Sequence, residues 1–288
     1  MSLSALSSTS KTDDAAGLAP GDFDLLRKLL VNQAGIVLER SQEYLAEARL
    51  PPVARQHGMS DISEIIAALR NGRDKELEID VIDAFTTNET SFFRDSHPFE
   101  DFVNIVMPEL LANRPPTASI RIWCGASSSG QEPYTLAMIF AENFPELVAQ
   151  HRIKILATDL SRTMVARTQE GRYSQFEVNR GLPAPMLIKY FDQVGRDWQA
   201  KPELRNMIDA KECNLLEPWP MVPRSDIVFL RNVLIYFSAE TKTDILERIR
   251  TKVLHPDGYL FLGSSETTLN LQTELKAMRF DRGQCYRP

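Results

Sequence analysis

Apolar residues recur at helical spacing through the first third of the chain, after a polar start. Residues 1–20 are rich in Ser, Thr and Ala with almost no large apolar side chains, so we expect a disordered tail. Beyond it, Phe23, Leu26, Leu29 and Leu30 share one helical face. Three more helices are predicted over 41–53, 60–69 and 74–85. Residues 21–90 are therefore expected to form a small all-helical domain.

A connecting segment follows at residues 91–117. Pro98 suits the first turn of a helix, and Phe99, Phe102, Val106 and Leu110 follow at helical spacing. The stretch 113–117, which contains two prolines, ends that helix. We interpret these residues as a linker with one connecting helix.

The pattern changes at Ser119, where short apolar runs begin to alternate with amphipathic ones. Strands are predicted at 120–124, 153–157, 226–230 and 259–262, with helices at 133–144, after Ser161 and after Ser238. This alternation predicts an α/β fold, with a doubly wound, Rossmann-like parallel sheet over 118–288. Residues 280–286 are expected to add an antiparallel edge strand. Turn and apolar residues interleave at about 191–207, which suggests a small antiparallel β insertion.

Composition and charge narrow the function classes. The net charge of −6 argues against broad nucleic-acid binding, which needs a basic footprint. No apolar run is long enough to cross a membrane. The three cysteines are far apart, with no spacing typical of a metal site or a disulfide framework. We expect a cytoplasmic monomer that holds no metal.

The run Thr86-Thr-Asn-Glu-Thr-Ser-Phe-Phe-Arg94 combines hydroxyls, an amide, two adjacent phenylalanines and an arginine. A plain loop rarely needs two neighbouring Phe residues, and a plain core segment rarely carries so many hydrogen-bonding groups. Read alone, the run could still be a capped linker. It gains weight from the polar residues that follow the predicted strands.

The first of these polar groups lies after the first strand, in the small-residue loop 125–130. Small residues let a ligand approach the backbone, and N–H groups at a helix start favour a carboxylate or phosphate. The loop is not a phosphate loop, because no Gly-Lys-Ser/Thr follows. Glu132, just inside the next helix, either complements the helix dipole or meets an ammonium group of a ligand.

Other strand ends carry further candidates. Asp159 ends the second strand, where such folds place an acid on ribose hydroxyls, although it could instead cap the next helix. Asn214, Arg231 and Asn232 follow later strands. Because ligands in open α/β sheets bind outside the carboxyl ends of strands, these side chains either bind ligand or join loops together.

Together these motifs resemble the CheR-type chemotaxis receptor methyltransferases over about residues 21–288. The resemblance rests on TTNETSFFR at 86–94, GQEPY at 130–134, ATD at 157–159, NL at 214–215, RNVLIYF at 231–237, PDG at 256–258 and GSSE at 263–266. It implies an enzyme that moves a methyl group from S-adenosylmethionine to receptor glutamates in chemotactic adaptation.

The resemblance also implies roles for individual residues. Asn88, Thr90 and Arg94 would close over the cofactor, Glu132 and Asp159 would bind its polar groups, Asn214 and Leu215 would contact its adenine end, and Arg231 and Asn232 would complete the pocket. Arg94 and Tyr236 would lie nearest the transferring methyl group. Arg94 would orient the acceptor carboxylate and Tyr236 would donate to it, with no strong base required because a glutamate is already anionic at neutral pH.

The cytoplasmic helical domain of chemoreceptors is the partner that the resemblance implies. Whether a regulatory protein also binds is left open; neither nucleic acid nor direct membrane insertion is expected. In some relatives the β insertion binds a C-terminal pentapeptide of the receptor. Here the insertion looks shorter and lacks a Gly-rich loop beyond Gly195, so we expect no strong tether binding. The alternatives are a cofactor-binding regulatory protein without catalysis and a methyltransferase for another substrate.

Overall fold

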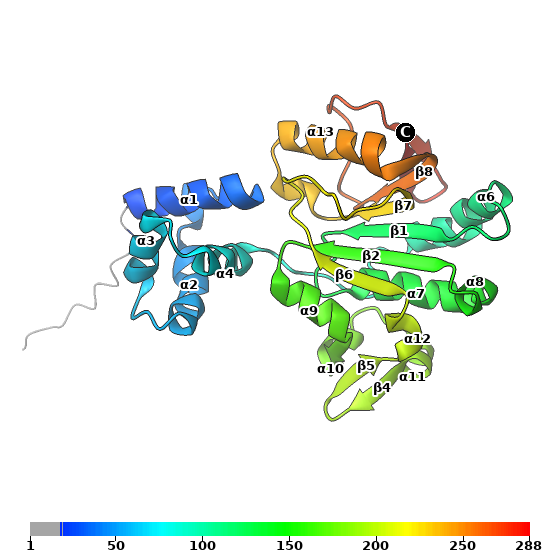
Figure 1. The fold of residues 1–288 in the computed structure, drawn as a ribbon, viewed down its shortest axis with the longest axis horizontal. Helices are drawn as coiled ribbons and strands as arrows, with labels where there is room; N and C mark the ends of the chain where they lie inside the picture. The colour runs from blue at the N-terminus through cyan, green and yellow to red at the C-terminus, as the bar shows by residue number, and fades with distance from the viewer. Residues whose placement is uncertain (1–17, 19) are drawn as a thin grey trace, which may run out of the picture. The chain divides into compact units, whose positions relative to one another are not determined.

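The computed structural model describes residue 18 and residues 20–288 (Figure 1). The tail expected at 1–20 therefore lies, apart from residues 18 and 20, outside the described residues. The chain divides into two compact units. One contains residues up to Lys28 and Leu38–Val81; the other contains Leu29–Val37 and Ile82–Pro288.

The first unit is helical, as its apolar spacing predicts. Its helices are α1 (Pro20–Ala34), η1 (Arg40–Gln42), α2 (Tyr44–Gln56), α3 (Ile62–Asn71) and α4 (Lys75–Phe85), and α1 and α4 each run on into the second unit. Leu26, Leu50, Ile65 and Leu77 are fully buried. Asp61 starts α3 by accepting a hydrogen bond from Glu64 N at 3.1 Å. The four predicted helices are thus confirmed.

The second unit contains a seven-stranded sheet in the order β6-β2-β1-β7-β8-β10-β9. Its strands are β1 (Ile120–Gly125), β2 (Ile153–Asp159), β6 (Ile208–Glu212), β7 (Ser225–Leu230), β8 (Leu254–Leu262), β9 (Lys276–Arg279) and β10 (Gln284–Arg287). The first five strands of this order, β6, β2, β1, β7 and β8, are parallel to one another. Strand β10 pairs antiparallel with both β8 and β9. The predicted edge strand at 280–286 is corrected in one respect: β10 begins at Gln284, and Phe280 lies in the turn that joins β9 to it.

Helices cover both faces of this sheet, because its central strands are apolar on both sides. Ile122 and Phe229 belong to one buried cluster with residues of α7 (Gln131–Asn143), whereas Trp123 and Val228 belong to a second cluster with residues of α13 (Ala239–Arg248). Successive strand residues face opposite sides, so the alternation assigns each side chain to one layer. The doubly wound prediction is confirmed. Outside the β insertion, this unit also contains α5 (His97–Asp101), η2 (Phe102–Val106), α6 (Met107–Ala112), α8 (Pro145–Ala149), α9 (Arg162–Glu170), η3 (Leu234–Tyr236) and η4 (Ile249–Val253).

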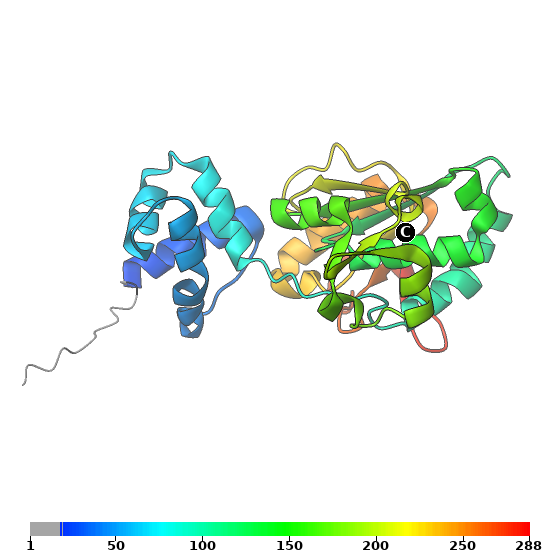
Figure 2. The same cartoon turned by 90° about the horizontal axis from the view of Figure 1, so that it is seen from below.

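The predicted antiparallel insertion is present and larger than expected. Its three strands have the order β3-β5-β4: β3 (Arg172–Ser174), β5 (Asp197–Ala200) and β4 (Phe191–Val194). The helices α10 (Gln175–Val178), α11 (Ala184–Tyr190) and α12 (Pro202–Arg205) gather around it (Figures 1 and 2). Strand β3 was not predicted, because three residues are too few to show an alternating pattern.

None of the helices in the described part of the chain combines the length and the apolar character that a bilayer crossing requires.

Candidate functional site

The predicted site residues lie at one edge of the large sheet. Strands β6, β2, β1, β7 and β8 are parallel, so their carboxyl ends share that edge. The chain leaves β1 toward β2 on one side and returns to β7 on the other, which makes the β1–β7 boundary a topological switch point. The residues that follow these ends are Asn214 and Leu215 after β6, Asp159 at the end of β2, Glu132 after β1, and Arg231, Asn232 and Tyr236 after β7.

The loop between β1 and α7 has a tightly curved backbone. Ala126, Ser128 and Gly130 have positive φ angles of 55°, 51° and 93°. A Cβ on Gly130 would come within 2.8 Å of Thr168 Oγ1, so α9 packs directly against the loop. The small residues that the sequence shows here are required by this curvature and close packing.

Asp159 fixes the same loop from the neighbouring strand. Its Oδ2 accepts from Ser128 N at 2.7 Å and its Oδ1 accepts from Ser161 N at 2.9 Å. Burial raises the pKa of the Asp159 carboxyl, and the backbone donors at Ser161 and Ser128 oppose that rise. The helix cap itself is Ser161, whose hydroxyl accepts from Met164 N, so Asp159 is not needed as the cap of α9. A carboxylate has about four acceptor positions, so Asp159 can also accept from a ligand hydroxyl.

The run 86–94 is anchored to the second unit through its phenylalanines and its backbone. Phe92 is buried and makes edge contacts with Tyr173 and Phe191, with ring centroids 5.0 and 5.8 Å apart. Phe93 N donates to Thr135 Oγ1 at 3.1 Å, and Ser128 Oγ donates to the Asn88 carbonyl at 2.9 Å. The two neighbouring Phe residues therefore attach a polar segment beside the β1–α7 loop.

Gly181 lies against this anchored segment, and its replacement should displace it. Gly181 has φ +89°, and a Cβ there would lie 2.1 Å from the Phe92 carbonyl oxygen. We expect Gly181→Ala to lower the free energy of unfolding by about 2–4 kcal/mol through the clash and the strained backbone. Gly195→Ala is the matched control, since Gly195 also has a positive φ (+65°) but no atom lies within 4 Å of its Cβ position. Urea unfolding measures both; equal losses would contradict the close contact.

Arg231 joins three segments of the site. Its side chain is 2% exposed, and it donates to Glu132 Oε2 at 2.8 Å, to the Arg94 carbonyl at 2.8 Å and to Asp95 Oδ2 at 2.9 Å. The sequence left open whether Arg231 binds a ligand or joins loops; the structure shows that its guanidinium joins the linker to α7. Burial raises the pKa of the Glu132 carboxyl, while the charges of Arg231 and then Arg94 lower it.

Glu266 is a site residue that sequence reasoning quoted in a motif but did not single out. It is 6% exposed, and its carboxylate accepts from the backbone N–H groups of Asn232 and Gly263 at 2.8 Å and of Ile235 at 3.3 Å. Asn232 has φ 59°, an unusual conformation for a residue other than glycine. Glu266 therefore fixes the turn that carries Arg231, Asn232 and Tyr236.

The remaining predicted residues are placed less closely together. Asn214 uses its side-chain oxygen to accept from Leu216 N at 3.0 Å, and Leu215 is buried in the cluster with Trp123. Tyr236 ends the turn η3 and is half-buried. Arg94 Nη1 donates to the Glu89 carbonyl at 3.0 Å. Hydrogen bonds connect Arg231 with Glu132 and with the Arg94 carbonyl, and Asn232 is the next residue after Arg231. Asn214 and Leu215 follow β6, which lies two strands from β1 and three from β7.

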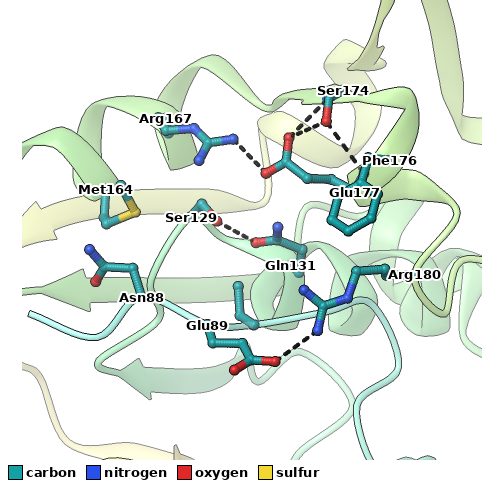
Figure 3. A pocket seen from close by; sticks show the side chains of 11 residues that line it. Asn88, Glu89, Ser129, Gln131, Met164, Arg167, Ser174, Phe176, Glu177 and Arg180 are labelled. Carbon is teal, nitrogen blue, oxygen red and sulfur yellow. Dashed lines mark hydrogen bonds and ion pairs between the residues drawn. The ribbon is translucent and has the colours of Figure 1, made fainter.

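A pocket of about 450 Å³ opens beside the anchored run (Figure 3). Asn88, Thr90, Ser129, Gln131 and Met164 line one part of it, and Arg167, Ser174, Phe176, Glu177 and Arg180 line the part next to the β insertion. Two predicted cofactor residues, Asn88 and Thr90, are among them. This volume and mixed lining suit a small polar ligand.

Comparisons with known proteins decide the family. The CheR methyltransferase SAM-binding domain matches residues 88–283, and the CheR methyltransferase all-alpha domain matches residues 21–86. The chain belongs to the CheR family. Chemotaxis protein methyltransferase 1 of Pseudomonas aeruginosa is 42% identical over 93% of this chain and 98% of that one. Chemotaxis protein methyltransferase Cher2 of Pseudomonas putida is 39% identical over 92% of this chain and 97% of that one.

Similarity to solved structures is much weaker. PKMT2 of Rickettsia typhi gives a TM-score of 0.37 at 15% identity over 61% of this chain and 26% of that one, too low for any argument. The family match alone establishes that this CheR chain is a chemotaxis methyltransferase with S-adenosylmethionine as methyl donor. The carboxyl ends of these strands suit that donor chemically, because the carboxyls of Glu132 and Asp159 can accept from an ammonium group and from ribose hydroxyls.

Proposed function

We propose that this CheR enzyme methylates glutamate side chains of chemoreceptors, and that its site is the β1–β7 edge together with the anchored run 86–94. One observation carries the proposal: Arg231 binds the Arg94 carbonyl and the Glu132 carboxylate at the same time. Arg94, the residue proposed to orient the acceptor, is thereby held at the edge where the donor is proposed to bind.

Asp159 and Glu132 are the proposed acceptors for the polar groups of the cofactor, with Asp159 on its ribose. Asn88, Thr90, Arg94 and Asn232 are proposed to complete its binding, and Asn214 and Leu215 to contact its adenine end. Arg231 is proposed to contribute through Glu132 and the linker, because both of its terminal nitrogens already donate to them. These assignments come from the family resemblance and are supported by the placement of the residues along one edge.

The proposed reaction depends mainly on how the acceptor carboxylate is positioned relative to the methyl group. The acceptor glutamate has an ordinary pKa of about 4.3 and is anionic at neutral pH, so no general base is needed. S-adenosylmethionine supplies a methyl carbon that accepts a carboxylate oxygen while the carbon–sulfur bond breaks, its electron pair staying on sulfur, to give a methyl ester and S-adenosylhomocysteine. Arg94 is proposed to hold one carboxylate oxygen and Tyr236 to donate to it, which leaves the other oxygen free to attack.

The partner follows from the same proposal. A chemotaxis methyltransferase acts on chemoreceptors, and we propose their cytoplasmic helical domain as the substrate. A cytoplasmic location, a monomeric state and the lack of tether binding stay predictions. Calorimetric titration with an aromatic-acidic pentapeptide tests the last of these, and low-micromolar binding would contradict it.

Labelled S-adenosylmethionine and membranes that contain chemoreceptors test the proposed function. Wild type is expected to attach base-labile label to receptors, and Arg94→Ala is expected to lower the transfer rate about 100-fold or more, because the acceptor is no longer oriented. Calorimetry with S-adenosylhomocysteine should accompany the assay, since Arg94 is also proposed to contact the cofactor. Cofactor binding by wild type without receptor labelling would favour a regulatory protein or another substrate.

A further inference from the structure

An ion pair joins two residues that line the pocket. Arg180, in the segment between α10 and α11, contacts Glu89 in the anchored run, with Arg180 Nη2 and Glu89 Oε1 2.9 Å apart. Both residues line the pocket, and their side chains point toward one another in Figure 3. The side chains are 42% and 68% exposed, so the pair is open to solvent and contributes little to stability.

Glu89 lies between two arginines. Its carboxylate contacts Arg180, and its carbonyl accepts from Arg94 Nη1 at 3.0 Å. Arg180 and Arg94, the arginine proposed to orient the acceptor, thus contact the same residue, one at its carboxylate and one at its carbonyl.

The other arginine in the pocket is held more firmly. Arg167 contacts Glu177 at 2.6 Å, and the Glu177 carboxylate also accepts from the backbone N–H and the hydroxyl of Ser174 at 2.9 Å. Glu89 has no such second support among the described contacts of its carboxylate. An incoming anion can therefore replace Glu89 as the partner of Arg180 at a lower free-energy cost than it can replace Glu177 as the partner of Arg167.

An apolar surface accompanies Arg180. Phe176 is 71% exposed although it lines the pocket, and the Arg180 guanidinium lies over its ring, 5.9 Å from the ring centroid. Backbone packing restricts where Arg180 can move, because its neighbour Gly181 touches the Phe92 carbonyl. A large exposed ring beside a cation suits a peptide segment with both apolar and acidic side chains.

We propose that Arg180 binds a carboxylate of the receptor segment, in exchange for the carboxylate of Glu89, and that Phe176 packs against the same segment. This inference rests on the proposed function, since it assumes an acidic protein acceptor. Arg180 keeps an anionic partner throughout such an exchange, and the exposed Glu89 carboxylate returns to solvent. Arg180 is then a specificity residue for the acceptor and not for the cofactor.

Three variants test the exchange: Arg180→Ala, Glu89→Gln, and the control Arg172→Ala. Arg172 is an arginine of similar exposure, 40%, that pairs with Asp197 outside the pocket lining. Initial rates against receptor concentration give KM, and calorimetry gives the Kd of S-adenosylhomocysteine. We expect Arg180→Ala to raise the receptor KM about tenfold, which corresponds to about 1.4 kcal/mol, with the Kd unchanged.

Glu89→Gln separates substrate binding from a purely structural contact. It breaks the same ion pair but frees Arg180, so its receptor KM should equal or fall below the wild-type value, and Arg172→Ala should match wild type. Equal rises of KM in Arg180→Ala and Glu89→Gln would show that the pair only fastens the linker, and would overturn the inference. An unchanged KM in Arg180→Ala, or a weakened cofactor Kd, would overturn it too. Absence of receptor methylation by wild type would instead refute the proposed function on which it rests.

Discussion

Asp159→Asn is expected to weaken binding of S-adenosylhomocysteine by about 100-fold. The neutral amide offers a single acceptor oxygen, whereas the Asp159 carboxylate already uses one lone pair of each oxygen on Ser128 N and Ser161 N. The variant must therefore give up either its support of the β1–α7 loop or its proposed bond to the ribose. Hydrogen bonds to charged groups contribute about 1.5–3 kcal/mol, which is about 10- to 150-fold in Kd.

Calorimetric titration with S-adenosylhomocysteine measures this loss. Asp192→Asn is a suitable control, because Asp192 is 67% exposed on strand β4, away from the strand edge. Urea unfolding of both variants shows how much stability is lost when Asp159 no longer holds the β1–α7 loop. A Kd within about twofold of wild type, with stability unchanged, would contradict the ribose role of Asp159.

Arg231→Met is expected to produce the largest loss of stability, about 3–5 kcal/mol. The substitution keeps an apolar stem but leaves Glu132, which is 13% exposed, without its cation, and an unpaired carboxylate with so little access to water is expensive. Asp95, which is 30% exposed, loses the same partner at a smaller cost. The Arg94 carbonyl also loses its donor. Arg231→Lys is the matched control; it retains the charge, but an ammonium cannot reproduce the planar, multiply donating fork, so we expect an intermediate loss.

The same variant should show a characteristic pH dependence. Burial raises the pKa of Glu132 and Arg231 lowers it, so removal of Arg231 should raise that pKa further. The native state then binds a proton that the unfolded state has released, and the free energy of unfolding falls as pH rises through this range. As the pH falls from about 7 to about 5, the free energy of unfolding of Arg231→Met should therefore rise by more than that of wild type, which restores part of the lost stability. Urea unfolding at both pH values measures this; a loss independent of pH would contradict a buried, unpaired Glu132.

Local pattern predicted the architecture of this protein well. Apolar runs such as 120–124 and 226–230 identify strands buried on both faces, and the polar residues that end them identify the edge of the sheet. Asp159 and Glu132 were found in this way. The short strand β3 escaped because three residues carry no periodicity, and the strand expected at 280–286 includes a turn.

The sequence could not predict which side chains far apart along the chain contact one another. Arg231 contacts Glu132 and Asp95 across separations of 99 and 136 residues, so only the folded chain shows that its two terminal nitrogens are already paired. Glu266 supports the Asn232 turn from 34 residues away. Arg180 was not among the residues predicted from the sequence, because its proposed role depends on its contact with Glu89, which only the folded chain shows.

Peptide mapping by mass spectrometry shows directly whether this enzyme methylates glutamate side chains of chemoreceptors. Receptor cytoplasmic fragments would be incubated with the enzyme and S-adenosylmethionine, digested, and analysed before and after mild alkali. We expect methyl groups on glutamate side chains that alkali removes, formed by wild type and nearly absent with Asp159→Asn at limiting cofactor. Methyl groups on nitrogen that resist alkali, or an unmodified receptor beside a cofactor-bound enzyme, would contradict it.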